Sequence, residues 1–178
     1  MRKFNIGDFI LRYVIILLAG LGNLFIFYWV FTPLTIKAVS FILGIFSNTI
    51  TIGNQIFSSL GALELIPPCI AGAAFFLLFA LILSTARLSI KKRAWIFLSS
   101  SAMFFVLNIA RIIFLFLISE KPYFETFHWI SWNILSTVLV IAVWLFNVWL
   151  FKVKSVPVYT DFEELLRVIK PKKSKRRK

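Results

Sequence analysis

The sequence contains one cysteine and one histidine, two residue types that can act together in nucleophilic catalysis. Cys69 follows Pro67 and Pro68 at the start of an apolar stretch, so we expect it at a helix N-terminus, where the dipole favours a thiolate. His128 begins the last apolar stretch and can take the thiol proton. Both residues also have ordinary interpretations, because most free cysteines are small buried hydrophobes and His128 adjoins an interfacial Trp.

A charged residue, Arg111, interrupts a long apolar stretch, and Asn108 shares its helix face at position i−3. An arginine at the centre of a membrane helix costs roughly 2.5–3.5 kcal/mol on insertion scales, which favours a functional reason for it. Its guanidinium can stabilise a developing oxyanion or hold a carboxylate. The alternatives are that Arg111 extends to lipid headgroups or pairs with Asn108.

The composition predicts an integral membrane protein that is built from α-helices. The 178 residues are 60% hydrophobic and 17% aromatic, and the mean hydropathy is +0.91. Apolar runs of about 20 residues match a bilayer core of roughly 30 Å and exclude a soluble domain. We expect an all-α bundle of four membrane spans, over residues 9–31, 69–88, 94–119 and 128–151.

The basic residues predict how these spans are oriented. The net charge is +13, and basic residues cluster near the N-terminus, between the second and third spans, and in the tail from Lys152 onward. Such clusters mark cytoplasmic segments. The first two clusters are Arg2, Lys3 and Arg12, and Lys91, Lys92 and Arg93. This orientation places Cys69, Arg111 and His128 toward the extracellular leaflet on three successive spans.

The segment between the first two spans is harder to place. We expect Pro33 to end the first span, which leaves an apolar helix over residues 34–46 of only about 20 Å. It would lie in the outer interface and precede a turn-rich loop, or a short hairpin, over 47–65. The alternative is five spans with the N-terminus outside, which would break the positive-inside rule at the N-terminal basic residues.

Two domains follow from this organisation. Residues 1–151 are predicted as the membrane-embedded domain, and residues 152–178 as a basic cytoplasmic tail. Within the tail, 161–169 is expected to form an amphipathic turn or two, and 171–178 is expected to be disordered. An anionic lipid surface, rather than nucleic acid, is the expected partner of this tail.

These motifs resemble the exosortase/archaeosortase family over about residues 33–151. The resemblance rests on Leu63-Glu64-Leu65-Ile66 leading to Cys69, on Asn108-Ile109-Ala110-Arg111, and on His128. It implies a membrane cysteine transpeptidase with Cys69 as nucleophile, Arg111 as oxyanion or substrate stabiliser, His128 as general acid and base, and Asn108 in support. The family's usual Cys-Ser/Thr-Gly differs from Cys69-Ile70-Ala71-Gly72, which is more similar to a divergent archaeal branch.

The resemblance implies substrates that are exported proteins with a C-terminal motif, a transmembrane helix and a basic tail. Cleavage near the motif would form a thioester on Cys69, which a lipid headgroup or water would resolve. We expect no cofactor, and the sequence lacks the His-Glu-x-x-His and Gly-x-Ser-x-Gly motifs of zinc and serine enzymes. The alternative is a non-enzymatic transporter subunit or assembly protein in which Arg111 binds anionic lipid or a partner helix.

Overall fold

The computed structural model describes residues 6–153 and 155–169, and it is 72% helical. In these parts of the chain, three helical stretches are long and apolar enough to cross a membrane: Phe25–Phe46, Ile90–Leu117 and Phe124–Leu150. Large apolar side chains such as Trp29, Phe41 and Trp149 are exposed. A soluble monomer rarely exposes apolar surface on this scale, so the chain is a membrane-embedded protein.

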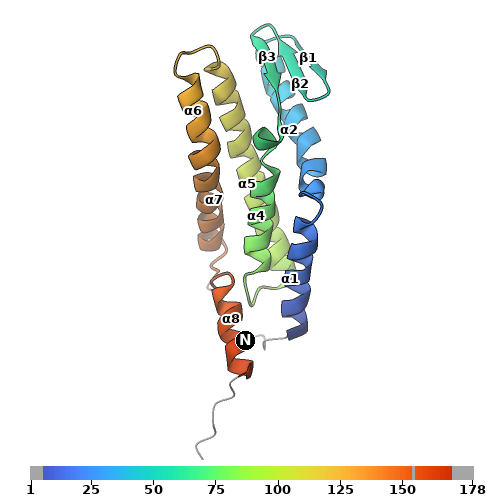
Figure 1. Ribbon diagram of the computed structural model, residues 1–178, viewed down its shortest axis with the longest axis vertical. Helices are drawn as coiled ribbons and strands as arrows, with labels where there is room; N and C mark the ends of the chain where they lie inside the picture. The colour runs from blue at the N-terminus through green and yellow to red at the C-terminus, as the bar shows by residue number, and fades with distance from the viewer. Residues whose placement is uncertain (1–5, 154, 170–178) are drawn as a thin grey trace, which may run out of the picture.

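Twelve elements make up the described chain. In order they are α1 (Ile6–Gly20), α2 (Phe25–Phe46), β1 (Thr49–Ile52), β2 (Gln55–Ser58), β3 (Gly61–Glu64), α3 (Pro67–Ile70), α4 (Gly72–Leu83), α5 (Ile90–Leu117), α6 (Phe124–Ile130), the π-helix η1 (Ser131–Leu135), α7 (Ser136–Leu150) and α8 (Tyr159–Ile169). In Figure 1, α1 and α2 follow one another along the long axis, and the three strands lie at the end opposite α8.

The break in the first apolar stretch is not at Pro33, so that prediction is wrong. Pro33 lies inside α2, and the chain breaks earlier, at residues 21–24. Gly22, Asn23 and Leu24 have φ values of 75°, 55° and 60°. Gly and Asn accept this left-handed conformation readily, whereas a proline within an apolar span loses a single helix bond. Residues 34–46 are therefore the second half of α2 and not a separate interfacial helix.

Residues 47–65, predicted as a turn-rich loop or a short hairpin in an otherwise all-α protein, fold as a three-stranded sheet. The strands form an antiparallel meander in the order β1-β2-β3. Ile56 and Leu65 are buried in one cluster with Val39 and Leu43 of α2 and with Phe116 of α5. This packing fixes the sheet over the ends of α2 and α5, directly before the segment that carries Cys69.

The second predicted span, 69–88, is not one continuous helix. The short helix α3 ends at Ile70, the next residue, Ala71, has a left-handed φ of 58°, and α4 then covers only twelve residues. Twelve residues rise about 18 Å, so α4 without α3 is shorter than a bilayer core of roughly 30 Å. A Cβ on Gly72 would lie 2.8 Å from the ring of Tyr28, so the close packing of α2 on α4 requires glycine there.

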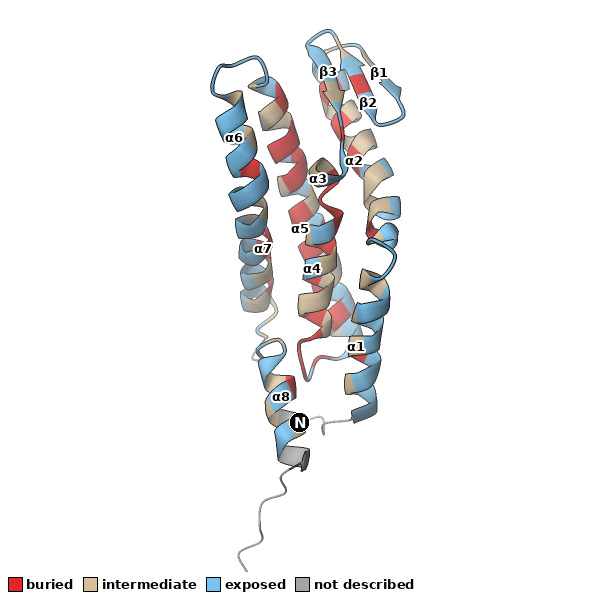
Figure 2. Cartoon of the chain, in the orientation of Figure 1, coloured by how far each residue is buried: buried red, intermediate tan, exposed pale blue. Residues whose placement is uncertain are grey.

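Helix α5, predicted over 94–119, is the central element of the bundle. In Figure 2 the buried residues gather on α5 and α4, while the outward sides of α1, α2 and α6 are exposed. Phe75 and Phe104 lie in a cluster that joins α2, α4, α5 and α7. Phe31 stacks on Phe75 with ring centroids 3.5 Å apart. These aromatic contacts hold α4 against α5 and so position α3 above it.

The amphipathic turn or two predicted over 161–169 is helical but belongs to a longer helix, α8, which begins at Tyr159 and is bound to the start of the chain. Arg12 donates two hydrogen bonds of 2.8 Å to the carboxylate of Asp161, and both residues are buried. Arg12 also donates to the carbonyl of Leu83. The sequence groups Arg12 with the cytoplasmic basic cluster, but its partner in the tail removes it from solvent. Residues 171–178 lie outside the described residues.

Candidate active site

The Cys69 thiol is held by a tight turn at the end of the sheet. Pro67 and Pro68 occupy the first two positions of α3, where a missing N–H costs nothing. The Cys69 N–H donates to the carbonyl of Ile66 at 2.8 Å. The side chain is a half-buried free thiol. The rigid prolines and the hydrogen-bonded turn therefore fix the direction of the thiol.

Asn108 on α5 supports this turn from the side. Because Ala71 is left-handed, the helix does not continue regularly past α3, and the Cys69 carbonyl accepts instead from Asn108 Nδ2 at 2.9 Å. Asn108 is only 1% exposed, so this bond is shielded from water. Asn108 does not pair with Arg111, which was one sequence-based alternative. It binds the backbone of the candidate nucleophile.

Arg111 lies one helical turn further along α5, and it is a buried cation. Its guanidinium donates to the carbonyls of Pro68 at 3.3 Å and Ser131 at 3.4 Å, and to the hydroxyl of Ser136. It is 8% exposed, and no carboxylate pairs with it in the described residues. Neutral acceptors hold the group in place but leave its charge uncompensated. The site therefore favours a bound anion or a developing negative charge.

The π-helix η1 explains how the backbone carbonyl of Ser131 can accept a hydrogen bond from Arg111. A π-turn displaces the i→i+4 pattern, and here the Ser131 carbonyl accepts from both Arg111 and the hydroxyl of Ser136. Single π-turns inside α-helices are frequent at functional sites. No sequence motif predicts the π-helix. Its only indication in the sequence is the spacing of five positions between Ser131 and Ser136.

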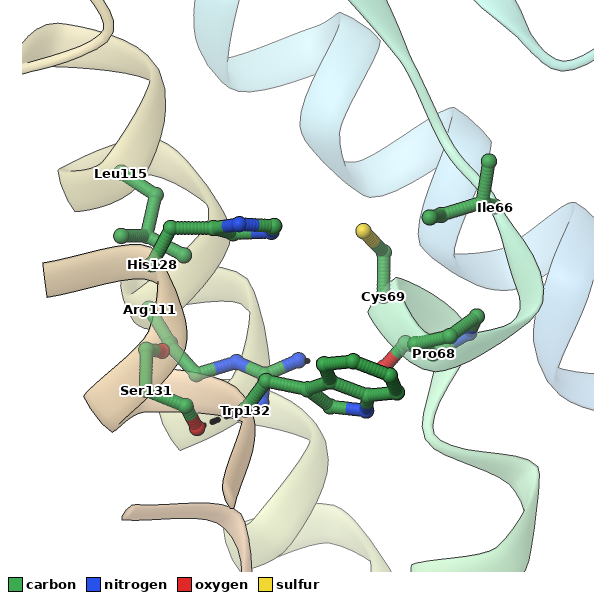
Figure 3. A pocket seen from close by; sticks show the side chains of 8 residues that line it. All are labelled: Ile66, Pro68, Cys69, Arg111, Leu115, His128, Ser131 and Trp132. Carbon is green, nitrogen blue, oxygen red and sulfur yellow. Dashed lines mark hydrogen bonds between the residues drawn. The ribbon is translucent and has the colours of Figure 1, made fainter. Parts of the chain in front are cut away.

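Cys69, Arg111 and His128 line one pocket with a volume of about 80 Å³, together with Pro68 and Trp132. Figure 3 shows the thiol and the imidazole pointing toward each other across the gap, with the guanidinium beside them. No hydrogen bond joins the thiol and the imidazole in the described structure, although proton transfer between them requires an approach to hydrogen-bonding distance. His128 instead stacks on Phe124, with centroids 5.3 Å apart.

A second cavity, of about 220 Å³, adjoins the first and shares Cys69, Arg111 and His128 with it. Its far wall is formed by β3, including Ala62 and Glu64. Several polar atoms around the site also lack partners. Arg111 Nε, Asn108 Oδ1 and Ser131 Oγ are buried without a hydrogen-bond partner in the described structure.

No family model, no curated protein and no solved structure matches this chain.

The structure thus brings together the three residues that were singled out from sequence, each from a different segment. Cys69 comes from α3, Arg111 from α5 and His128 from α6. Sequence reasoning missed Ser131 and Ser136, since a serine in an apolar helix carries no local signal for the arginine that it binds.

Proposed function

We propose that this protein is a membrane-embedded cysteine protease or transpeptidase of the exosortase/archaeosortase type, which cleaves C-terminal sorting signals of exported proteins. The observation that carries the proposal is the shared pocket of Cys69, Arg111 and His128. The chain has one cysteine and one histidine, and both lie in the pocket beside an arginine that pairs with no carboxylate among the described residues. Cysteine acyl transfer needs this set of groups.

The chemistry assigns one role to each side chain. His128 takes the proton of the Cys69 thiol, and the sulfur attacks the scissile carbonyl carbon. The carbonyl oxygen becomes an oxyanion, which the charge of Arg111 stabilises. When the tetrahedral intermediate collapses, the C–N bond breaks, the amine leaves with the proton from His128, and a thioester to Cys69 remains. A lipid headgroup, as nucleophile, then releases the product and restores the thiol.

The same proposal includes the membrane arrangement. The chain passes outward through α1 and α2, returns through α3 and α4, passes outward again through α5 and returns through α6 to α7. These four passes leave the sheet and the site toward the extracellular side of the cell membrane, and α8 with the basic tail toward the cytoplasm. The Lys91-Lys92-Arg93 cluster and the tail support this orientation through the positive-inside rule.

The test is to co-express the protein with candidate exported substrates that end in a motif, an apolar helix and a basic tail. The wild type should shorten the substrate, and Cys69→Ser should leave it intact while still accumulating in the membrane. Arg111→Lys keeps the charge but loses the geometry that three acceptors fix, so processing should fall by at least tenfold. Equal processing by Cys69→Ser would overturn the proposal, and loss with Arg111→Lys alone would favour a non-enzymatic lipid or partner site.

A further inference from the structure

Strand β3 forms one edge of the sheet, and this edge is next to the candidate site. Its ladder partner is β2, because the strand order is β1-β2-β3. The other edge strand, β1, packs near α2 and is joined to it by a hydrogen bond between Ser40 and Thr51. The two edges of the sheet are therefore not equivalent.

The register shows which backbone groups of β3 are free. In an antiparallel pair, alternate residues point their N–H and C=O groups toward the partner strand. The Leu65 N–H donates to the carbonyl of Asn54 across β2 and β3, so the odd-numbered positions face β2. Ala62 and Glu64 then direct their N–H and C=O groups away from the sheet. Neither makes a backbone hydrogen bond to another segment of the described chain.

These free groups border the cavity that ends at the thiol. Ala62 and Glu64 line the 220 Å³ cavity together with Cys69 and His128. In Figure 1, β3 is the strand nearest to α5 and α6, and Figure 3 shows the chain after β3 running through Ile66 to Cys69. An extended chain placed along β3 would therefore run directly to the thiol.

We infer that the segment of the substrate next to the scissile bond binds as an additional strand on the free edge of β3, an inference that rests on the proposed function. Backbone edges bind extended peptides through main-chain hydrogen bonds, and pockets select alternate side chains. Ala62 and Glu64 offer two donors and two acceptors for this purpose. β3 ends at Glu64 and α3 begins at Pro67, so the added peptide reaches the pocket at the position of Cys69.

The mode of binding also fits the chemistry of acyl transfer. An extended peptide presents its carbonyl groups sideways, where a thiol can approach them, and pairing with β3 fixes the carbonyl before attack. Each main-chain hydrogen bond contributes a modest net free energy, so losing one should weaken binding by about three- to tenfold. The effect should depend little on the sequence of the bound peptide.

The test uses a peptide reagent that reacts with the thiol, namely acetyl-tetra-alanine chloromethyl ketone. The sulfur displaces chloride and forms a stable C–S bond, and mass spectrometry follows the modification of Cys69 in the full-length protein in nanodiscs. A second reagent carries N-methyl groups on alternate amides and cannot pair as a strand. Iodoacetamide, which has no peptide backbone to pair, reports the reactivity of the thiol itself.

Each rate is divided by the rate of the same reagent with glutathione. The parent peptide should exceed iodoacetamide in this ratio, and the N-methylated peptide, which loses two main-chain hydrogen bonds, should react about ten- to a hundredfold more slowly than the parent. Glu64→Pro removes one outward N–H and should slow the parent peptide by about three- to tenfold, with iodoacetamide unaffected. Thr49→Pro places the same residue at the start of the opposite edge strand and should change neither rate.

The inference is overturned if the parent and N-methylated peptides label Cys69 equally, or if the parent has no advantage over iodoacetamide. Its failure differs from that of the proposed function. Substrate processing that depends on Cys69 together with labelling that ignores the peptide backbone would reject only the strand pairing. Processing by Cys69→Ser would instead reject the catalytic role.

Discussion

The buried ion pair between α1 and α8 allows a sharp prediction, because one arginine binds two carboxylates in different surroundings. The side chain of Asp161 is 1% exposed and lies 2.8 Å from Arg12, whereas that of Asp8 is 51% exposed and lies 3.1 Å from it. Asp161→Asn removes the buried charge and one of two strong acceptors. Asp8→Asn removes a carboxylate that water already solvates in part.

The magnitudes follow from these surroundings. Breaking a buried pair by removing one partner costs about 3–5 kcal/mol, and the lower end applies here because Arg12 keeps Asp8 and the Leu83 carbonyl. A loss of about 3 kcal/mol raises the equilibrium for release of α8 by roughly a hundredfold. The pair to Asp8 is partly solvated, so Asp8→Asn should cost at most about 1 kcal/mol.

Amide hydrogen exchange in detergent measures the release of α8 directly, because local opening exposes its amides without global unfolding. Asp161→Asn should accelerate exchange over α8 by roughly a hundredfold and leave the interior of α5 unchanged. Asp8→Asn should accelerate it by less than about sixfold. Equal effects of the two variants, or an acceleration below about threefold for Asp161→Asn, would refute the conclusion that the Arg12–Asp161 ion pair holds α8 against α1.

Other substitutions test the supports of the thiol. Gly72→Ala would bring a methyl group to 2.8 Å from Tyr28 and should lower the thermal midpoint in detergent, with unaltered stability as the contrary result. Ala71→Gly removes the penalty of a left-handed alanine and should stabilise the fold by up to about 1 kcal/mol, whereas destabilisation would contradict the role given to this turn. Asn108→Leu leaves the Cys69 carbonyl unpaired and should lower the free energy of unfolding by about 1–3 kcal/mol. It should also slow the labelling of Cys69 by iodoacetamide, whereas faster labelling would contradict a positioning role for Asn108.

The membrane character was predictable because it depends on composition, and the grouping of Cys69, Arg111 and His128 in one pocket was predictable because it depends on topology. Apolar runs predict the helices α5 and α6–α7, and basic clusters predict which ends of the spans lie together. The charge clusters predict that Cys69, Arg111 and His128 lie at the same end of their helices, and the structure places the three residues in one pocket.

Local backbone geometry was not predictable in the same way. Pro33 is the strongest helix-breaking residue in its segment, yet α2 continues through it and breaks instead where Gly22 and Asn23 accept a positive φ. The left-handed residue at the next break is Ala71 and not a glycine, so the sequence does not indicate the break there. The glycine stands one position later, where Gly72 packs against Tyr28. The bond from Asn108 to the Cys69 carbonyl exists only because of that break, so sequence spacing could not reveal it.

The most direct test of the central claim is to trap the acyl-enzyme. Because Cys69 is the only cysteine in the sequence, a thioester can form at one position alone. Intact-protein mass spectrometry of the wild type with a processed substrate should show an added substrate fragment that hydroxylamine removes and that peptide mapping places on Cys69. A processed substrate without this adduct, together with undiminished processing by Cys69→Ser, would contradict the account.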